Sequence, residues 1–210
     1  MAWEKLKQAL LADVSAIIDR RGDAAHRDDL HRLSAAFFGR FSAEDMRGRS
    51  AENLYGCLYG LLRFMQQWPG DAPRVRFLNP SIGSHGWESR ATILAVLCRD
   101  MPFCTASVRG ELNQRGVSIH TVTSCNLRVQ RDSHGEFQAL VGAAGSAGSG
   151  NAAAGLSAES LLFFEISRHS NLDDLAPLQA SLESILEEVA TVVGDFPAMR
   201  DQLAAARKAI

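Results

Sequence analysis

The sequence has little that would place it in a membrane, outside the cell or on nucleic acid. None of its apolar runs reaches the roughly 18 residues of a membrane span. Its first residues lack the basic and apolar regions of a secretory signal, which favours a cytoplasmic protein. The 24 acidic and 22 basic residues leave a net charge of −2, so neither nucleic acid nor an anionic membrane is an expected partner.

Catalytic and metal-binding motifs are also missing. The sequence has no GxSxG, HExxH or P-loop pattern. Its four cysteines form no CxxC pair, and no histidine stands at metal-ligand spacing from them. We expect reduced, buried thiols, including Cys104, which has no nearby base in the sequence to make it a nucleophile. The chain is therefore expected to hold no catalytic site, metal or cofactor of its own.

Residues 1–70 are expected to form a helical segment. Apolar residues recur at helical spacing in three stretches, which are the residues before Arg21, 24–41 and 51–68. Ser50 is suited to cap the third helix, in which Gly56 and Gly60 lie four residues apart on one face and favour close packing of another helix. The run Pro69-Gly-Asp-Ala-Pro73 then marks a boundary.

Beyond residue 70 the pattern changes. Strands are predicted at 74–78, 91–98, 117–130, 136–141 and 160–167, and helices at 103–115 and 174–194. The strand at 91–98 is apolar on both faces and is expected near the sheet centre. Alternation from Val117 to Val129 indicates one covered face and one wetter face. We predict an α+β domain at 71–200, an antiparallel sheet covered by helices on one face, and the start of a further helix at 201–210.

Three local patterns sharpen this prediction. Pro102 suits a first helical turn and Asp100 can cap its free N–H groups, so that strand, helix and strand form half of a split β-α-β unit. The last helix is expected to end at Gly194-Asp-Phe-Pro197. The Gly/Ala/Ser-rich residues 142–157 are expected to be a flexible loop. Within it, Gly148 to Ala153 matches a dinucleotide fingerprint in form only, because the required strand and helix do not flank it.

A series of short motifs occurs in order along the chain. They are Asn79-Pro80, His85-Gly-Trp87, Asp100-Met-Pro-Phe103, Ser107-Val108, Arg131-Asp132 with Gly135, Glu159-Ser160 and Asp195-Phe-Pro-Ala-Met-Arg200. In this order they resemble the N-terminal region of the large bacterial NAD-specific glutamate dehydrogenases. The resemblance implies ACT-like (ferredoxin-like) regulatory modules in a homo-oligomer. The whole enzyme would use NAD to deaminate glutamate to 2-oxoglutarate and ammonia, and its catalytic domains would lie elsewhere in the same polypeptide.

The same motifs suggest a site for a small effector. The glycine-bearing loop that contains His85 can present backbone N–H groups, the helix after Pro102 attracts a carboxylate, and Asp100 can meet an ammonium group. We therefore predict an amino-acid effector site at Asn79, His85, Asp100 and Ser107. The family has a Leu-Val-Asp-like tripeptide after the position of Phe103, whereas this sequence has Cys104-Thr-Ala106. The carboxylate of that tripeptide is therefore absent, which weakens the prediction.

The alternative is a structural module that packs against other domains or subunits and binds no small molecule. In that case Trp87 anchors its loop to the core, as large aromatic residues commonly do. A concave, polar pocket near Asn79, His85 and Asp100 favours the effector site. A pocket filled by Trp87 and Phe103 favours the structural module.

Overall fold

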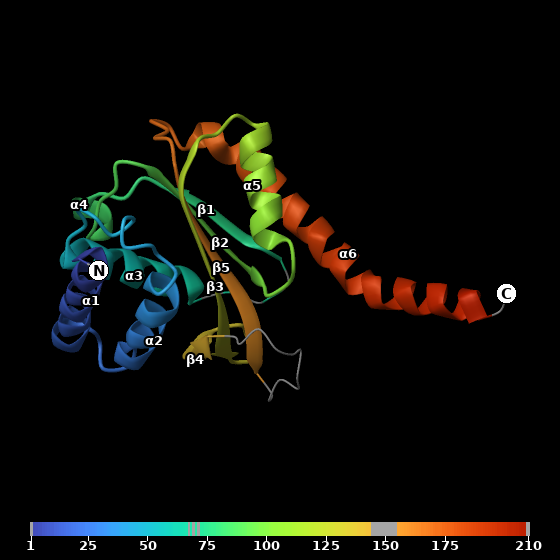
Figure 1. The fold of residues 1–210 in the computed structure, drawn as a ribbon, viewed down its shortest axis with the longest axis horizontal. Helices are drawn as coiled ribbons and strands as arrows, with labels where there is room; N and C mark the ends of the chain where they lie inside the picture. Colours follow the sequence, from blue (N-terminus) through green and yellow to red (C-terminus); the bar gives the residue numbers. More distant parts are fainter. Residues whose placement is uncertain (1, 67, 69, 71, 144–154, 209–210) are drawn as a thin grey trace.

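The computed structural model describes residues 2–66, 68, 70, 72–143 and 155–208 (Figure 1). In chain order its elements are α1 (Ala2–Arg21), α2 (Arg27–Phe38), α3 (Ala51–Met65), β1 (Arg74–Leu78), α4 (Ile82–His85), β2 (Thr92–Arg99), α5 (Cys104–Gln114), β3 (Ile119–Arg131), β4 (Phe137–Ala143), β5 (Leu156–Ile166), a 3-10 turn (Asp173–Leu175) and α6 (Ala176–Lys208). The predicted class, N-terminal helices followed by an antiparallel sheet with helices, is confirmed.

The five strands form one sheet in the order β1-β2-β5-β3-β4, and every neighbouring pair is antiparallel. Strands β2 and β3 are joined through α5 and lie on either side of β5, so they run parallel to each other. This is the predicted split β-α-β unit. Strand β2 lies inside the sheet, as its two apolar faces predicted.

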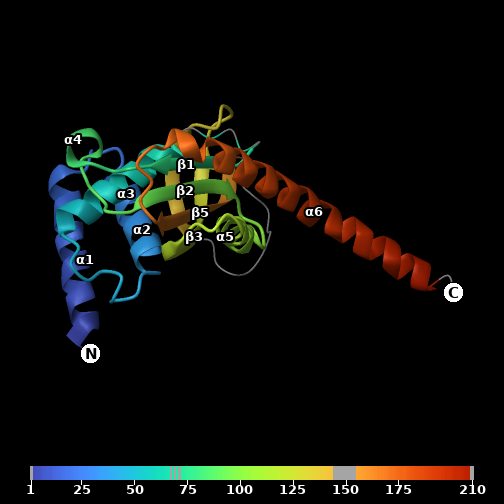
Figure 2. The same ribbon diagram turned by 90° about the horizontal axis from the view of Figure 1, so that it is seen from above.

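Helices cover both faces of the sheet. Figures 1 and 2 show α1, α2 and α3 on one face and α5 with the first half of α6 on the other. Side chains of β2 alternate between the two layers: Ile93, Ala95 and Leu97 belong to the core under α1–α3, and Leu94 and Val96 to the core under α5 and α6. The prediction that helices cover one face only is therefore wrong, because the N-terminal helices cover one face and α5 and α6 the other. The predicted wetter side of β3 is confirmed in its second half, where Asn126 is exposed and Ser124 and Arg128 are half-buried.

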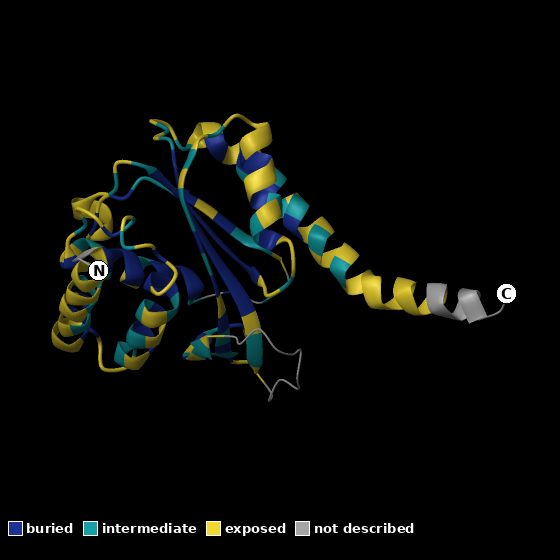
Figure 3. Ribbon diagram, viewed as in Figure 1, coloured by how far each residue is buried: buried dark blue, intermediate teal, exposed yellow. Residues whose placement is uncertain are grey.

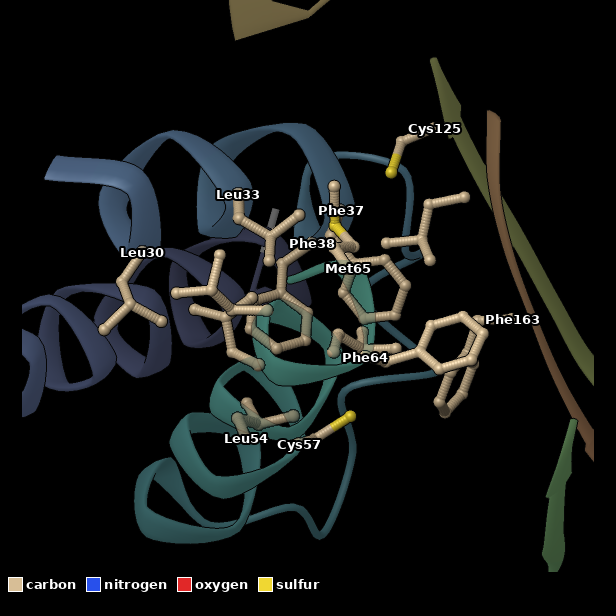
Figure 4. Close-up of a cluster of buried hydrophobic side chains, with 14 of the residues drawn as sticks. Leu30, Leu33, Phe37, Phe38, Leu54, Cys57, Phe64, Met65, Cys125 and Phe163 are labelled. Atoms are coloured by element: carbon tan, nitrogen blue, oxygen red, sulfur yellow. The ribbon is translucent and has the colours of Figure 1, made fainter. Parts of the chain in front are cut away.

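The core under α1–α3 is rich in aromatic residues (Figure 4). Phe37 of α2 meets Phe163 of β5 edge to face, with ring centroids 5.3 Å apart, and also contacts Phe38 and Phe41. Phe37, Phe38 and Phe163 are at most 1% exposed. Each such pair contributes roughly 0.5–1.5 kcal/mol beyond the burial of its area. The N-terminal helices and the sheet thus share one apolar core.

Strand β3 does not keep one set of side chains on one face. Cys125, Leu127 and Val129 point into the core under α1–α3, but Ile119 and Val122 pack on the opposite side of the sheet. The register against β5 shifts between Ile119 and Thr121, which moves the following residues to the other face. The prediction of a single face from Val117 to Val129 is correct only for its second half.

The start of α5 differs from the prediction. The helix begins at Cys104, and Phe103 before it takes a left-handed conformation with φ of 74°, so Pro102 lies outside the helix. No side chain caps this end. The carboxylate of Asp100 instead accepts hydrogen bonds from Asn126 Nδ2 at 2.8 Å and Ser160 Oγ at 3.0 Å. The predicted capping role of Asp100 is wrong, because its carboxylate is hydrogen-bonded to side chains of β3 and β5.

Helix α6 is longer than predicted. It runs for 33 residues through Gly194 and Pro197, and residues 201–208 are its continuation and do not start a new helix. The helix leaves the sheet after its first half, as Figure 2 shows. A proline removes one backbone hydrogen bond, yet the residues on both sides of Pro197 are helical.

Both ends of the predicted loop 142–157 belong to strands. Gly142 and Ala143 belong to β4, and Leu156 and Ser157 belong to β5. Residues 144–154 of the predicted loop, including the Gly148–Ala153 fingerprint, lie outside the described residues.

Strand β4 lies at a sheet edge that α2 protects. The backbone N–H of Leu140 donates to the buried carboxylate of Asp29 at 2.8 Å, and its carbonyl accepts from Arg32 Nη1 at 3.0 Å. Unpaired backbone groups of an edge strand otherwise invite pairing with another chain. These two side chains occupy them and tie α2 to the sheet.

Two glycines of α3 allow Trp87 to pack against the helix. A Cβ atom on Gly56 would lie 2.7 Å from Trp87 Cβ and 2.8 Å from the carbonyl oxygen of Gly86. At Gly60 it would lie 3.3 Å from Trp87 Nε1. Gly56 and Gly60 were expected to let another helix pack closely against α3, but the residue that packs against them is Trp87, in the loop after α4. Trp87 itself is 4% exposed and belongs to the core under α1–α3, so it anchors its loop as the structural interpretation predicted.

Substitution of Gly56 by alanine should lower the free energy of unfolding by about 1–3 kcal/mol, because the new methyl group must displace both Trp87 and the Gly86 backbone. Chemical denaturation measures the change. Gly194→Ala in α6 is the matched control: its Cβ would meet no atom within 4 Å, and alanine should raise stability by about 0.5–1 kcal/mol. A Gly56→Ala variant as stable as the parent chain would contradict this account.

Two thiols lie deep in the core under α1–α3. Burial raises the pKa of Cys57 and of Cys125 to about 12, from the usual 9.0 of a thiol. Both remain protonated in the folded chain at neutral pH, as expected of structural cysteines.

These shifts predict a loss of stability in alkali. Unfolded thiols ionise near pH 9.0 and folded ones near about 12, so the stabilisation is complete below pH 9.0 and is lost as the pH rises toward 12. Urea denaturation at several pH values across this window should show a smaller fall in the Cys57→Ala, Cys125→Ala double variant than in the parent chain. Equal slopes in the two proteins would show that these thiols do not carry the effect.

Candidate functional site

The structure separates the residues of the predicted effector site. Asn79 directly follows β1 and lies beside the start of β2, where its side chain accepts from Thr92 Oγ1 at 2.7 Å and donates to the His169 carbonyl at 2.8 Å. Asp100 follows the other end of β2, roughly 25 Å away at 3.3 Å per strand residue. Ser107 is in α5, on the face of the sheet opposite α3. The four residues do not form one pocket, and effector binding at them stays a prediction.

Other motif residues also hold strands together. Arg131 forms a buried, bidentate ion pair with Glu159, at 2.6 and 2.8 Å, and donates to the Gly135 carbonyl at 2.8 Å. The guanidinium carbon of Arg131 lies 5.4 Å from the centre of the Trp68 ring. Because removing one partner would leave an unpaired buried charge, this pair fixes β3 against β5. These motif residues have structural roles in this chain.

His85 is the predicted site residue that borders a cavity. It ends the short helix α4, where its Nδ1 faces the backbone N–H of Ser81 at 3.3 Å. The adjacent cavity has a volume of about 530 Å³ and lies between α3, β1 and the α4 loop. We call it the arginine cleft. Its lining residues are Cys57, Tyr59, Gly60, Leu61, Arg63, Phe64, Gln66, Arg74, Arg76, Leu78, Ser84, His85, Trp87, Ile93, Ala95 and Phe163.

The arginine cleft is positively charged. Arg63 comes from α3, Arg74 and Arg76 come from β1, and no aspartate or glutamate is among the lining residues. Arg74 packs over the Phe64 ring, with its guanidinium carbon 5.0 Å from the ring centre, and donates to the Phe64 carbonyl at 3.0 Å. Burial, followed by the charges of Arg76 and Arg131, lowers the pKa of Arg74. An anion in this cleft would relieve that repulsion.

Trp87 adds a hydrogen-bond donor to the wall of the cleft. Among the described residues its indole N–H has no hydrogen-bond partner, although the side chain is 4% exposed. Within the described ranges, Arg27 Nε is the one side-chain nitrogen or oxygen that is both sealed from solvent and without a hydrogen-bond partner, so the unpaired indole nitrogen of Trp87 is not sealed. The indole nitrogen is therefore still reachable, and the arginine cleft is the cavity that Trp87 lines.

One pattern in the sequence is a weak indication of this site. In the strand Arg74-Val-Arg-Phe-Leu78, arginines alternate with apolar residues, which places Arg74 and Arg76 on one face. That Arg63 of α3 and His85 would border the same face depends on how the helix and the α4 loop pack. Charge spacing along the sequence could not reveal this arrangement.

A pair of thiols lies on the opposite side of the sheet. Cys98 Sγ and Cys104 Sγ are 3.6 Å apart, and both residues are buried. The hydrogen bond from the Cys98 thiol lowers the pKa of Cys104 and raises that of Cys98. Within the described residues no group of histidine, cysteine, aspartate and glutamate side chains could hold a metal ion. No helix among the described residues has the length and apolar character needed to cross a membrane.

The second half of α6 carries an exposed apolar face. Val192, Phe196 and Met199 recur at helical spacing and are 61%, 59% and 49% exposed, respectively. Figure 3 shows the change from buried to exposed residues along the helix. Phe103 at the start of α5 is 69% exposed and, with Val192, lines a shallow hollow between α5 and α6. Phe103 therefore does not fill a pocket beside Trp87.

Comparison with known proteins agrees with the motifs. The family model described as "Glutamate dehydrogenase, ACT1 domain" matches residues 33–182. The chain is 36% identical to the NAD-specific glutamate dehydrogenase of Halomonas elongata over 206 residues, which are 98% of this chain and 12% of that protein. It is 35% identical to the NAD-specific glutamate dehydrogenase of Pseudomonas aeruginosa over 186 residues, 89% of this chain and 11% of that protein. No solved structure matches the chain.

The chain thus spans about an eighth of the length of these relatives. Its matched residues include β1 to β5, α5 and the arginine cleft, and they end within α6. On this evidence the chain belongs to the NAD-specific glutamate dehydrogenase family and contains its ACT1 domain.

Proposed function

We propose that this chain is the regulatory and assembly segment of an NAD-dependent glutamate dehydrogenase. The whole enzyme would oxidise glutamate to 2-oxoglutarate and ammonia with NAD, in the cytoplasm and as a homo-oligomer. Catalytic domains of the same polypeptide would be the partners of this segment. A small effector would act by binding one packing arrangement of the module more tightly than another, since a ligand shifts an equilibrium only through such a difference.

The arginine cleft is the observation that supports regulation. It is concave, its volume of about 530 Å³ lies in the range of small-molecule sites, and its walls combine apolar and charged side chains. It also joins three separate elements, α3, β1 and the α4 loop. A ligand held between them would change how firmly α3 packs on the sheet.

A thermal-shift titration of the chain tests this proposal. The panel is the twenty amino acids, 2-oxoglutarate and NAD, followed by calorimetry on each ligand that raises the melting temperature. We expect a small carboxylate-bearing compound to bind, and Arg76→Gln to weaken its binding. Silence across the panel would contradict regulation through this cleft, and binding of NAD would contradict the prediction that the chain has no cofactor of its own.

The alternative, a packing module that binds no small molecule, is favoured by the exposed face of α6. Exposed apolar residues that line up on one side of a helix commonly mark an interaction site. Here Val192, Phe196 and Met199 lie on the half of the helix that leaves the sheet. We propose the other domains of the same polypeptide as their partner.

Phe196→Ser tests the assembly role. Because Phe196 is 59% exposed, the stability of the isolated chain should change by less than about 0.5 kcal/mol. In the full polypeptide the same variant should weaken assembly, which sedimentation velocity would detect. Ala198→Ser, also exposed but off the Val192–Phe196–Met199 face, is the control. Unchanged sedimentation of the Phe196→Ser protein would count against docking through this face.

A further inference from the structure

We propose that the arginine cleft selects a small dicarboxylate that carries no amino group, of which succinate and glutarate are the simplest examples. The inference rests on the proposed function, since it names the class of effector for the same site. It replaces the amino-acid effector that the sequence motifs suggested.

Two of the three arginines are available to a ligand. Within the described residues, neither Arg63 nor Arg76 has a hydrogen-bond or ion-pair partner, and both are exposed at the cleft. Arg74 packs against Phe64 and adds its charge from the floor. A guanidinium binds a carboxylate through two parallel hydrogen bonds, which makes arginine well suited to this group.

The placement of the arginines suits two acidic groups better than one. Arg74 and Arg76 lie two residues apart on one face of β1, about 7 Å from each other along the strand. Arg63 projects from α3, on the other side of the cleft. A molecule with carboxylates at both ends can contact the strand and the helix at the same time, whereas a monocarboxylate can contact one.

The walls of the cleft hold no carboxylate that could pair with an ammonium group. No aspartate or glutamate lines it, and its polar side chains include strong donors at Arg63, Arg76, His85 and Trp87. An ammonium group bound there would lose water without a negative partner and would be repelled by three guanidinium groups. The carboxylate expected to receive it, Asp100, lies at the far end of β2 and accepts from Asn126 and Ser160.

The apolar part of the cleft fits the short carbon chain of such a ligand. Leu78, Ile93, Ala95 and Phe163 form part of the lining, from β1, β2 and β5. The methylene groups of glutarate or succinate can cover this surface while the carboxylates reach its rim. An inorganic anion such as phosphate would leave this surface in contact with water.

Matched ligand pairs test the inference by isothermal titration calorimetry on the chain. Succinate and aspartate, and likewise glutarate and glutamate, differ by one amino group. We expect the dicarboxylate of at least one pair to bind about 10-fold more tightly than its amino acid. Inorganic phosphate at the same concentration should bind more weakly than either dicarboxylate.

Three variants assign the binding to the cleft. Arg63→Gln and Arg76→Gln should each weaken dicarboxylate binding by about 10-fold, because each removes a charged pair of hydrogen bonds. Trp87→Phe, which keeps the ring and removes the indole N–H, should weaken it by about 3-fold. Arg109→Gln, an exposed arginine of α5 outside the cleft, is the control and should bind as the parent chain does.

The outcomes separate the two proposals. Glutamate or aspartate binding as tightly as its partner, with the same loss in Arg63→Gln and Arg76→Gln, would overturn the dicarboxylate class and leave regulation through the cleft intact. Phosphate binding as tightly as the dicarboxylates would likewise overturn it in favour of a general anion site. Dicarboxylate binding that Arg63→Gln and Arg76→Gln leave unchanged would overturn the placement, and no binding by any of the ligands would overturn both proposals.

Discussion

The fold depends on burying both faces of its two inner strands. Every residue of β5 from Glu159 to Ile166 is buried, and seven of the eight residues of β2 are buried. At about 25 cal/mol for each Å² of apolar surface, neither face could remain in water without a large loss of stability. One layer of helices cannot cover two faces. The chain therefore encloses the sheet, with α1–α3 on one side and α5 and α6 on the other.

The candidate site lies where this enclosure is incomplete. Helix α3 covers the middle of the sheet, while β1 at its edge presents Arg74 and Arg76 on the same face. The gap between helix and strand is the arginine cleft, and Trp87 closes one part of it by packing against Gly56 and Gly60. The buried aromatic ring and the ligand-accessible indole N–H belong to the same side chain. The sequence alternatives, a core anchor or a binding residue, are thus compatible at Trp87.

Elements whose formation depends on local pattern were predicted well. The alternation in β1 and the two apolar faces of β2 identified both strands, and Ser50 caps α3 through the backbone N–H of Asn53 as its side chain suggested. Predictions failed where a distant partner competes for a group. Asp100 was expected to cap a helix, but in the folded chain its carboxylate accepts hydrogen bonds from Asn126 and Ser160. Pro197 was expected to end α6, although the residues on both sides of it remain helical.

The sequence by itself determined the class of fold, the family and most strand and helix positions, because spacing and short ordered motifs are properties of neighbouring residues. The tertiary structure alone decided which of these residues meet. It separated Asn79, His85, Asp100 and Ser107, used Arg131 and Glu159 to join strands, and assembled Arg63, Arg74 and Arg76 beside one cleft. The reason is that a site consists of side chains brought together by packing between elements distant in sequence, and local periodicity carries no information about that packing.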